Sequence, residues 1–109
     1  MNKTIKSFSK ARSRSSLKNK DLLNNANREI FQKEEDFKDF KFLIDKSKTN
    51  NLEIGFGDGK YLYEMAYLRP EENFIGIEVF ESGLANTYKK IVLNKIKNLS
   101  IIQGEIVQI

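Results

Sequence analysis

The chain has 109 residues, enough for one domain, and its 39% hydrophobic and 31% charged residues are the balance of an ordinary globular protein. It contains no Cys and no His, which excludes disulfides, thiolate metal sites and Ser-His or Cys-His catalysis. No stretch approaches the roughly 20 apolar residues of a membrane span, and no apolar segment follows the basic N-terminus as in a secretory signal. We therefore expect a cytoplasmic protein with neither a membrane partner nor a bound metal.

Positive charge is concentrated at the N-terminus. The whole chain carries +4, but residues 1–28 alone carry +7, so the remainder is slightly acidic. A basic arm on an acidic body is typical of a protein that binds a polyanion such as RNA. A solvated tail that binds nothing is the other interpretation of the same charges.

The first predicted elements are this arm and a helical segment. Residues 4–16 are rich in Ser, Lys and Arg, and we predict that they have no fixed structure unless bound. From about 20 to 44, apolar residues recur at helical spacing, which predicts two short helices or one interrupted helix. A polar connector follows, so we divide the chain into an arm with a helical segment at 1–46 and a second unit at 47–109.

The second unit alternates strands with helices. We predict strands at 51–54, 73–79 and 99–103, with helices at 60–69 and 81–95 between them. This order predicts parallel pairing with right-handed crossovers. The expected fold class is α/β, with about three parallel strands that form one nucleotide-binding half of a doubly wound, Rossmann-like sheet.

A glycine-rich loop directly follows the first of these strands. Gly55, Gly57 and Gly59 allow a sharp turn and close approach of a ligand to the backbone, although a plain tight turn also uses glycine. The third glycine comes one residue earlier than in the G-x-G-x-x-G of dinucleotide sites. Asp58 inside the loop would repel a pyrophosphate, but it tolerates the sulfonium and ammonium groups of S-adenosylmethionine. The loop therefore favours the methyl donor over NAD.

Three acidic residues stand near the carboxyl ends of the predicted strands, where open parallel sheets bind ligands. Glu53 and Glu78 lie at the ends of the first two strands, and Glu105 follows the third strand after Gly104. Glu78 can accept hydrogen bonds from ribose hydroxyls, and Glu105 can accept one from the amine of adenine. A solvated carboxylate would explain each residue singly, but the series of three favours a ligand site.

Two sequence runs, LEIGFGDG at 52–59 and NFIGIEV at 73–79, resemble the bacterial tRNA (guanine-N7)-methyltransferases. The Gly104-Glu105 corner is similar too, although the family usually has Gly-Asp there. The resemblance covers residues 50–109 well and extends weakly to the basic segment at 6–14.

The resemblance implies a class I S-adenosylmethionine-dependent methyltransferase fold and transfer of a methyl group to N7 of a guanine in tRNA. It implies that the cofactor is held by Glu53, Gly55, Gly57, Gly59, Glu78 and Glu105. It implies that tRNA is contacted by Lys10, Arg12 and Arg14.

The family's reaction depends on a Pro-Asp-Pro-Trp-type loop that would follow Ile109, so we expect a truncated form that contains no catalytic residue. A non-catalytic RNA-binding or S-adenosylmethionine-binding fragment is the alternative. The other expected partners are a missing C-terminal half, or a second copy that pairs through the exposed edge of the first strand.

Overall fold

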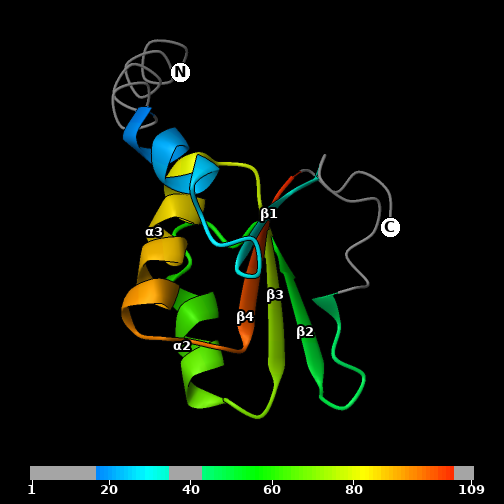
Figure 1. Ribbon diagram of the computed structural model, residues 1–109. Coiled ribbons are helices and arrows are strands. Elements are labelled where there is room, and N and C mark those ends of the chain that lie inside the picture. The colour runs from blue at the N-terminus through cyan, green and yellow to red at the C-terminus, as the bar shows by residue number, and fades with distance from the viewer. Residues whose placement is uncertain (1–16, 35–42, 105–109) are drawn as a thin grey trace, which may run out of the picture.

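The computed structural model describes residues 17–34 and 43–104 (Figure 1). A helical segment at 17–24 comes first. It is followed by β1 (Phe31–Lys33), β2 (Asn50–Ile54), α2 (Lys60–Leu68), β3 (Asn73–Glu78), α3 (Glu81–Leu93) and β4 (Leu99–Gln103). The strands form one parallel sheet in the order β1-β4-β3-β2. The predicted α/β fold with a parallel sheet is confirmed.

The sheet contains one strand more than the three predicted. The interpretation of residues 20–44 as helical is wrong for Phe31–Lys33, which form β1 and pair with β4. Three residues are too few for alternation to be distinguished from helical spacing, so the local pattern gave no strand signal. The second half of the predicted helical segment, at 35–42, lies outside the described residues.

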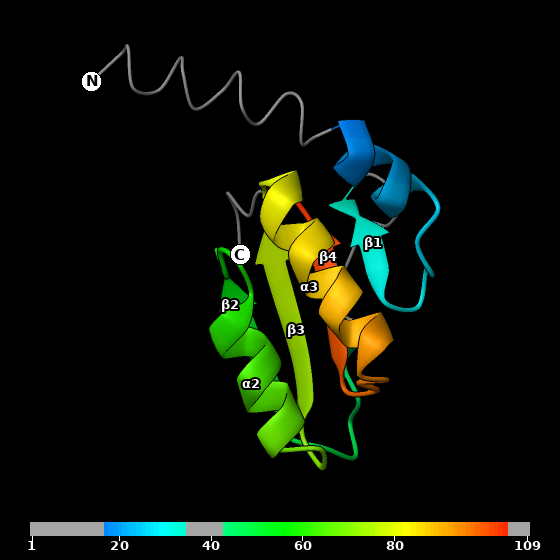
Figure 2. The same cartoon turned by 90° about the vertical axis from the view of Figure 1, so that its left-hand side faces the viewer.

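Both connecting helices, α2 and α3, cover the same face of the sheet (Figure 2). The strand order moves in one direction from β2 through β3 to β4, and right-handed crossovers then place both helices on one side. The buried apolar residues between these helices and the sheet include Leu62, Ala66, Phe74, Leu84, Ala85, Ile91, Leu99 and Ile101. A smaller cluster of Ile75, Ile77 and Ile102 occupies the other face. Because β3 is apolar on both faces, its carboxyl end is held firmly at the centre of the sheet.

β2 forms one edge of the sheet among the described strands, as expected for the first strand of the second unit. Leu52 and Ile54 pair in register with Ile75 and Ile77, so they lie on the face opposite the helices. They are 42% and 48% exposed, although their partners on β3 are buried. The β2 edge therefore presents apolar side chains at the surface of the described part of the chain.

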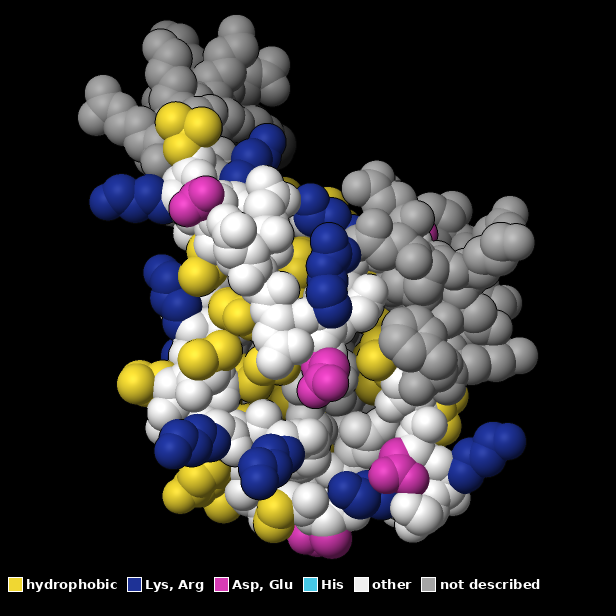
Figure 3. Space-filling model, in the orientation of Figure 1, with side chains coloured by type: hydrophobic (Ala, Val, Ile, Leu, Met, Phe, Trp, Pro, Cys, Tyr) yellow, Lys and Arg dark blue, Asp and Glu magenta, His cyan; other side chains and the backbone are white. Residues whose placement is uncertain are grey.

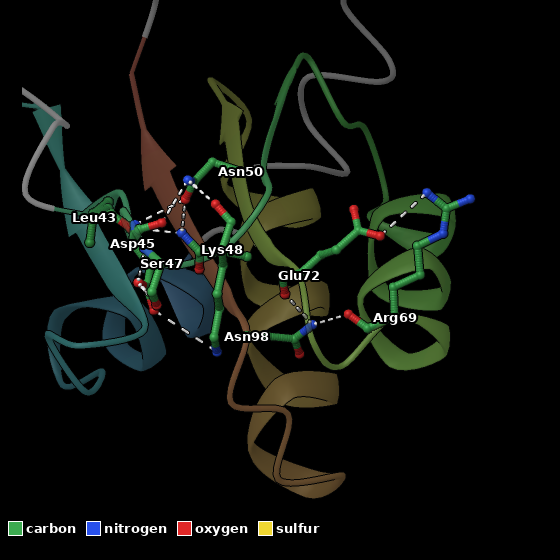
Figure 4. Close-up of polar contacts among 9 residues, drawn as sticks. Leu43, Asp45, Ser47, Lys48, Asn50, Arg69, Glu72 and Asn98 are labelled. Atoms are coloured by element: carbon green, nitrogen blue, oxygen red, sulfur yellow. Dashed lines mark hydrogen bonds and ion pairs between the residues drawn. The ribbon is translucent and has the colours of Figure 1, made fainter.

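Asn98 ties the C-terminal end of α2 to the sheet (Figure 4). Its side-chain Nδ2 donates to the carbonyl oxygens of Arg69 (3.0 Å) and Glu72 (2.9 Å), as Figure 4 shows, and to that of Ala66 (2.9 Å). The last carbonyls of a helix have no partner within the helix, so an outside donor is needed. Asn98 is 8% exposed and immediately precedes β4. One buried amide therefore fixes where the chain leaves α2 and where it enters β4.

A second polar cluster holds the connection that leads into β2, also shown in Figure 4. Asn50 Nδ2 donates to the carbonyls of Asp45 (2.8 Å) and Lys48 (2.9 Å), and Asn50 Oδ1 accepts from Asn73 Nδ2 at 2.7 Å. The hydroxyl and the N–H of Ser47 both donate to the Asp45 carboxylate, which lowers the pKa of that carboxyl below its usual value. These bonds align the start of β2 with the start of β3.

We predict that Asn98→Ala lowers the free energy of unfolding by about 2–4 kcal/mol, because three main-chain carbonyls lose their donor in a poorly hydrated place. Urea denaturation followed by circular dichroism measures this loss. Asn94→Ala is the matched control, since the exposed Asn94 amide donates to the carbonyl of Lys90 within α3's last turn. An equal loss in the two variants would contradict the role assigned to Asn98.

Candidate functional site

The glycine loop adopts backbone conformations that glycine permits and other residues rarely adopt. Gly55, Gly57 and Gly59 all have positive φ, at 72°, 66° and 80°. Phe56 points inward and belongs to the core cluster, which anchors the middle of the loop. Asp58 Oδ1 accepts from the N–H of Lys60, the first residue of α2, at 3.0 Å. The loop is therefore anchored in its middle by an aromatic side chain and at its end by a local hydrogen bond across Gly59.

The Glu78 carboxylate stands at the centre of the site. One oxygen, Oε1, accepts from the N–H of Gly57 at 2.7 Å. The other, Oε2, accepts from the N–H groups of Val79 (2.9 Å) and Phe80 (3.1 Å). The side chain is 5% exposed, so backbone donors replace most of its water. The sequence predicted an acid at the tip of this strand, and the structure places Glu78 there, against the glycine loop. Its contact with a ribose stays a prediction.

A hollow of about 350 Å³ opens beside this carboxylate. It is lined by Gly57, Asp58, Glu78, Phe80, Ser82, Gly83 and Asn86. Its two charged lining side chains are both acidic, and the positive end of the α3 dipole lies at the same place. Such a site attracts a ligand that is cationic in one part and rich in hydrogen-bonding groups in another.

A larger hollow of about 720 Å³ lies on the other side of Val79. Strand ends supply Val79, Gln103 and Gly104, and the N-terminal segment supplies Lys20, Asn24 and Lys33. Lys33 Nζ donates to Asn24 Oδ1 at 2.9 Å, which joins β1 to the helical segment in the wall. The sequence gave no sign of this wall, because it depends on β1 pairing next to β4.

Glu53 is not brought together with Glu78. It pairs in register with Gly76, two positions before the strand ends, whereas Glu78 pairs with Gln103. Its side chain lines a separate hollow of about 270 Å³, between β2 and α2, together with Tyr61 and Arg69. The structure thus places Glu78 in the glycine-loop site and Glu53 in a separate hollow. Four further predicted residues, Lys10, Arg12, Arg14 and Glu105, lie outside the described residues.

Several residues at the site were missed by sequence reasoning. Val79 and Phe80 are 49% and 54% exposed although they directly follow a buried strand, and each lines one of the hollows flanking Glu78. The sequence did contain a signal for them, because two apolar residues directly follow an acid at the end of a predicted strand. Such a place suits the flat apolar part of a ligand. The α3 residues Gly83 and Asn86 gave no comparable signal, since helical spacing does not show what a helix faces.

On the face shown in Figure 3, the Lys and Arg side chains of the described residues are scattered over several elements. In the part of the chain that the structure describes, no three acidic side chains come together as a group that could hold a metal ion. No helix in the same residues is both long and apolar enough to cross a membrane.

Comparison with known proteins identifies the family. Residues 47–109, more than half of the chain, match the family described as "Putative methyltransferase". The chain belongs to this methyltransferase family. The resemblance inferred from residues 52–59 and 73–79 is thereby confirmed.

Relatives of known name share the same region. The tRNA (guanine-N(7)-)-methyltransferase of Helicobacter acinonychis (strain Sheeba) is 38% identical over 71 residues, covering 65% of this chain and 17% of that protein. The protein of the same name from Bordetella pertussis (strain Tohama I) is 41% identical over 58 residues, covering 53% of this chain and 23% of its own length. The protein of the same name from Lacticaseibacillus casei (strain BL23) is 38% identical over 62 residues, covering 57% of this chain and 29% of that protein. The chain spans less than a third of the length of each of these relatives.

Two glycines of the loop should differ in their tolerance of alanine. At Gly55 an added Cβ would meet no described heavy atom within 4 Å, so Gly55→Ala should cost only the positive-φ penalty of about 1–2 kcal/mol. At Gly59 the Cβ would lie 1.8 Å from Oγ1 of Thr87, so Gly59→Ala should cost about 2–5 kcal/mol. Chemical denaturation of both variants tests this, and equal losses would refute the close packing at Gly59.

Proposed function

We propose that this chain binds S-adenosylmethionine at the glycine loop, with Glu78 as the principal polar contact. The observation that carries the proposal is the buried Glu78 carboxylate, held by backbone N–H groups at the junction of loop, strand and helix. Membership of a methyltransferase family supports a methyl donor as the ligand. The donor's methionine portion would lie against Gly55–Gly59, its ribose beside Glu78, and its adenine toward Val79 and Gly104.

The charges of the site support a sulfonium donor over a dinucleotide. Asp58 and Glu78 line the same hollow, and Glu81 in the first turn of α3 lines the larger one. A pyrophosphate placed there would face carboxylates, whereas the positive sulfonium and ammonium groups of S-adenosylmethionine are attracted to them. The Asp58 carboxylate also accepts from the N–H of Lys60 at the start of α2, where a phosphate binds in dinucleotide sites.

The remaining acceptor capacity of Glu78 sets how the ribose can be held. A carboxylate offers about four lone-pair directions, and three are occupied by the N–H groups of Gly57, Val79 and Phe80. The remaining direction belongs to Oε1, which has one partner. We therefore infer one strong ribose hydroxyl contact at Oε1 and a weaker, shared one at Oε2.

For the activity, we propose S-adenosylmethionine-dependent methylation of tRNA at N7 of guanine, carried out in the cytoplasm by the protein to which this region belongs. The relatives of that name support it, and the donor supplies an electrophilic methyl group on a sulfonium. The residues of this chain bind and orient the donor, and we assign none of them to the transfer step. The exposed apolar β2 edge supports completion of the sheet there, by further chain or by a second copy.

Calorimetric titration with S-adenosylmethionine tests the donor site. We expect Glu78→Gln to weaken binding at least tenfold, about 1.4 kcal/mol, because a carboxamide offers only one acceptor oxygen. Glu64→Gln is the matched control, since exposed Glu64 on α2 lines neither hollow beside Glu78. Melting curves confirm that each variant is folded at the titration temperature. A wild-type chain that takes no donor, or a Glu78→Gln variant that binds normally, would overturn the proposal.

A non-catalytic RNA-binding function is the second candidate, favoured by the net charge of +7 in residues 1–28. Both candidates assign the basic arm to tRNA, so we propose Lys10, Arg12 and Arg14 as phosphate contacts. Replacing all three with Ala should weaken tRNA binding and reduce the slope of log K against log salt by about 2–3. Fluorescence anisotropy at several salt concentrations measures that slope.

The control for this experiment removes the same charge from the folded body, with Ala at the exposed positions Lys46, Lys89 and Lys97. If both triple variants lose the same slope, the arm has no special role in RNA binding. If the arm variant loses tRNA binding while donor binding is absent in every variant, the non-catalytic candidate is favoured.

A further inference from the structure

One face of α3 presses against the glycine loop. Gly83, Asn86 and Thr87 stand at positions that share a helix face. A Cβ added to Gly83 would lie 1.9 Å from the carbonyl oxygen of Gly57, so at this point the helix backbone lies directly against the loop backbone. Thr87 is fully buried, and its side chain fills the space beside Gly59. The loop therefore has a wall on the α3 side as well as a carboxylate beneath it.

Two polar side chains of this face converge on a single loop atom, the carbonyl oxygen of Asp58. Asn86 Nδ2 donates to it at 2.9 Å. The Thr87 hydroxyl lies 3.3 Å from the same oxygen and 2.8 Å from the carbonyl of Gly83, so its one hydrogen is shared between them. Asp58 lies between Gly57 and Gly59, both of which have positive φ. Glycine backbones are the least restricted of all residues, so a loop built from them needs external bonds to keep one shape.

We propose that Asn86 and Thr87 are positioning residues that hold the Gly55–Gly59 loop in its ligand-binding shape through the Asp58 carbonyl. This rests on the proposed donor site in one respect: the loop is the element that the donor contacts. Glu78 holds the Gly57 N–H on one side of the loop, and Asn86 and Thr87 hold the carbonyl of Asp58 on the other. The peptide between Gly57 and Gly59 is thus held at both ends. Loss of the α3 bonds should raise the entropy that the loop loses on binding a ligand.

The test compares Asn86→Ala and Thr87→Val with Asn94→Ala and Thr87→Ser. Ala is a better helix former than Asn, so Asn86→Ala removes the bond to Asp58 without weakening α3. Thr87→Val keeps the shape and removes the hydroxyl, whereas Thr87→Ser keeps the hydroxyl. Asn94→Ala makes the same chemical change at the C-cap of α3, away from the loop.

Amide hydrogen exchange, measured by nuclear magnetic resonance, reports how often the loop opens in the absence of any ligand. We expect exchange at Gly57 and Gly59 to become at least fivefold faster in Asn86→Ala and Thr87→Val. It should stay unchanged in Asn94→Ala and return toward wild type in Thr87→Ser. The Phe74 amide, bonded to the carbonyl of Asn98 where β3 and β4 begin, is the internal reference. A merely structural role would speed exchange at Phe74 together with the loop, which would overturn the proposal.

Titration with S-adenosylmethionine supplies the second readout on the same four variants. We expect Asn86→Ala and Thr87→Val to bind at least threefold more weakly than wild type, and the other two to bind within twofold of it. A loop that loosens while donor affinity stays unchanged would overturn the positioning role. If the wild-type chain takes no donor, the proposed function fails, and the exchange rates of Gly57 and Gly59 alone decide whether α3 holds the loop.

Discussion

The structure at the carboxyl ends of the strands depends on the hydrogen bonds that the Glu78 carboxylate accepts. A nearly buried carboxylate is stable only where fixed donors replace its water, and here the donors come from the glycine loop and from the turn into α3. The two segments are separate in sequence, yet neither can change shape without taking a donor from Glu78. A single side chain therefore makes the loop after β2 and the turn after β3 one structural unit, and the N–H of Gly104 joins β4 to it through the Glu78 carbonyl.

The loop owes its shape to its surroundings more than to its own composition. Three glycines permit positive φ but specify nothing. The specification comes from Phe56 in the core, from Glu78 below and from the buried face of α3. A ligand therefore meets a surface whose backbone is already ordered, and little of its binding energy is used in ordering the loop. The same contacts explain why the loop and α3 are close enough to forbid a β-carbon at Gly83.

Strands β3 and β4 were predictable as mainly apolar runs, and β2 as a short segment that leads directly into the glycine loop. The order of elements then implied parallel pairing. β1 was not, because a three-residue strand exists only through its distant partner Ile101–Gln103. Glu78 was predictable from its position at a strand tip. Glu53 was grouped with Glu78 on the same reasoning, but the strand register places Glu53 opposite Gly76, two residues before the carboxyl end of β3. The roles of Asn86 and Thr87 depend on which way α3 faces, and no local pattern shows that.

The order of the strands has a consequence for how the molecule opens. β2, β3 and β4 pair with their sequence neighbours, whereas β1 pairs with a strand at the far end of the described chain, which is the costliest loop to close. β1 and the segment before it are fastened by a short ladder, by Leu23 and Phe31 in the core, and by the bond from the Asn27 N–H to the Tyr88 hydroxyl. This part of the molecule should form last and detach first. Since this part carries Lys20, Asn24 and Lys33, its local opening would remove one wall of the larger hollow while the glycine loop stays folded.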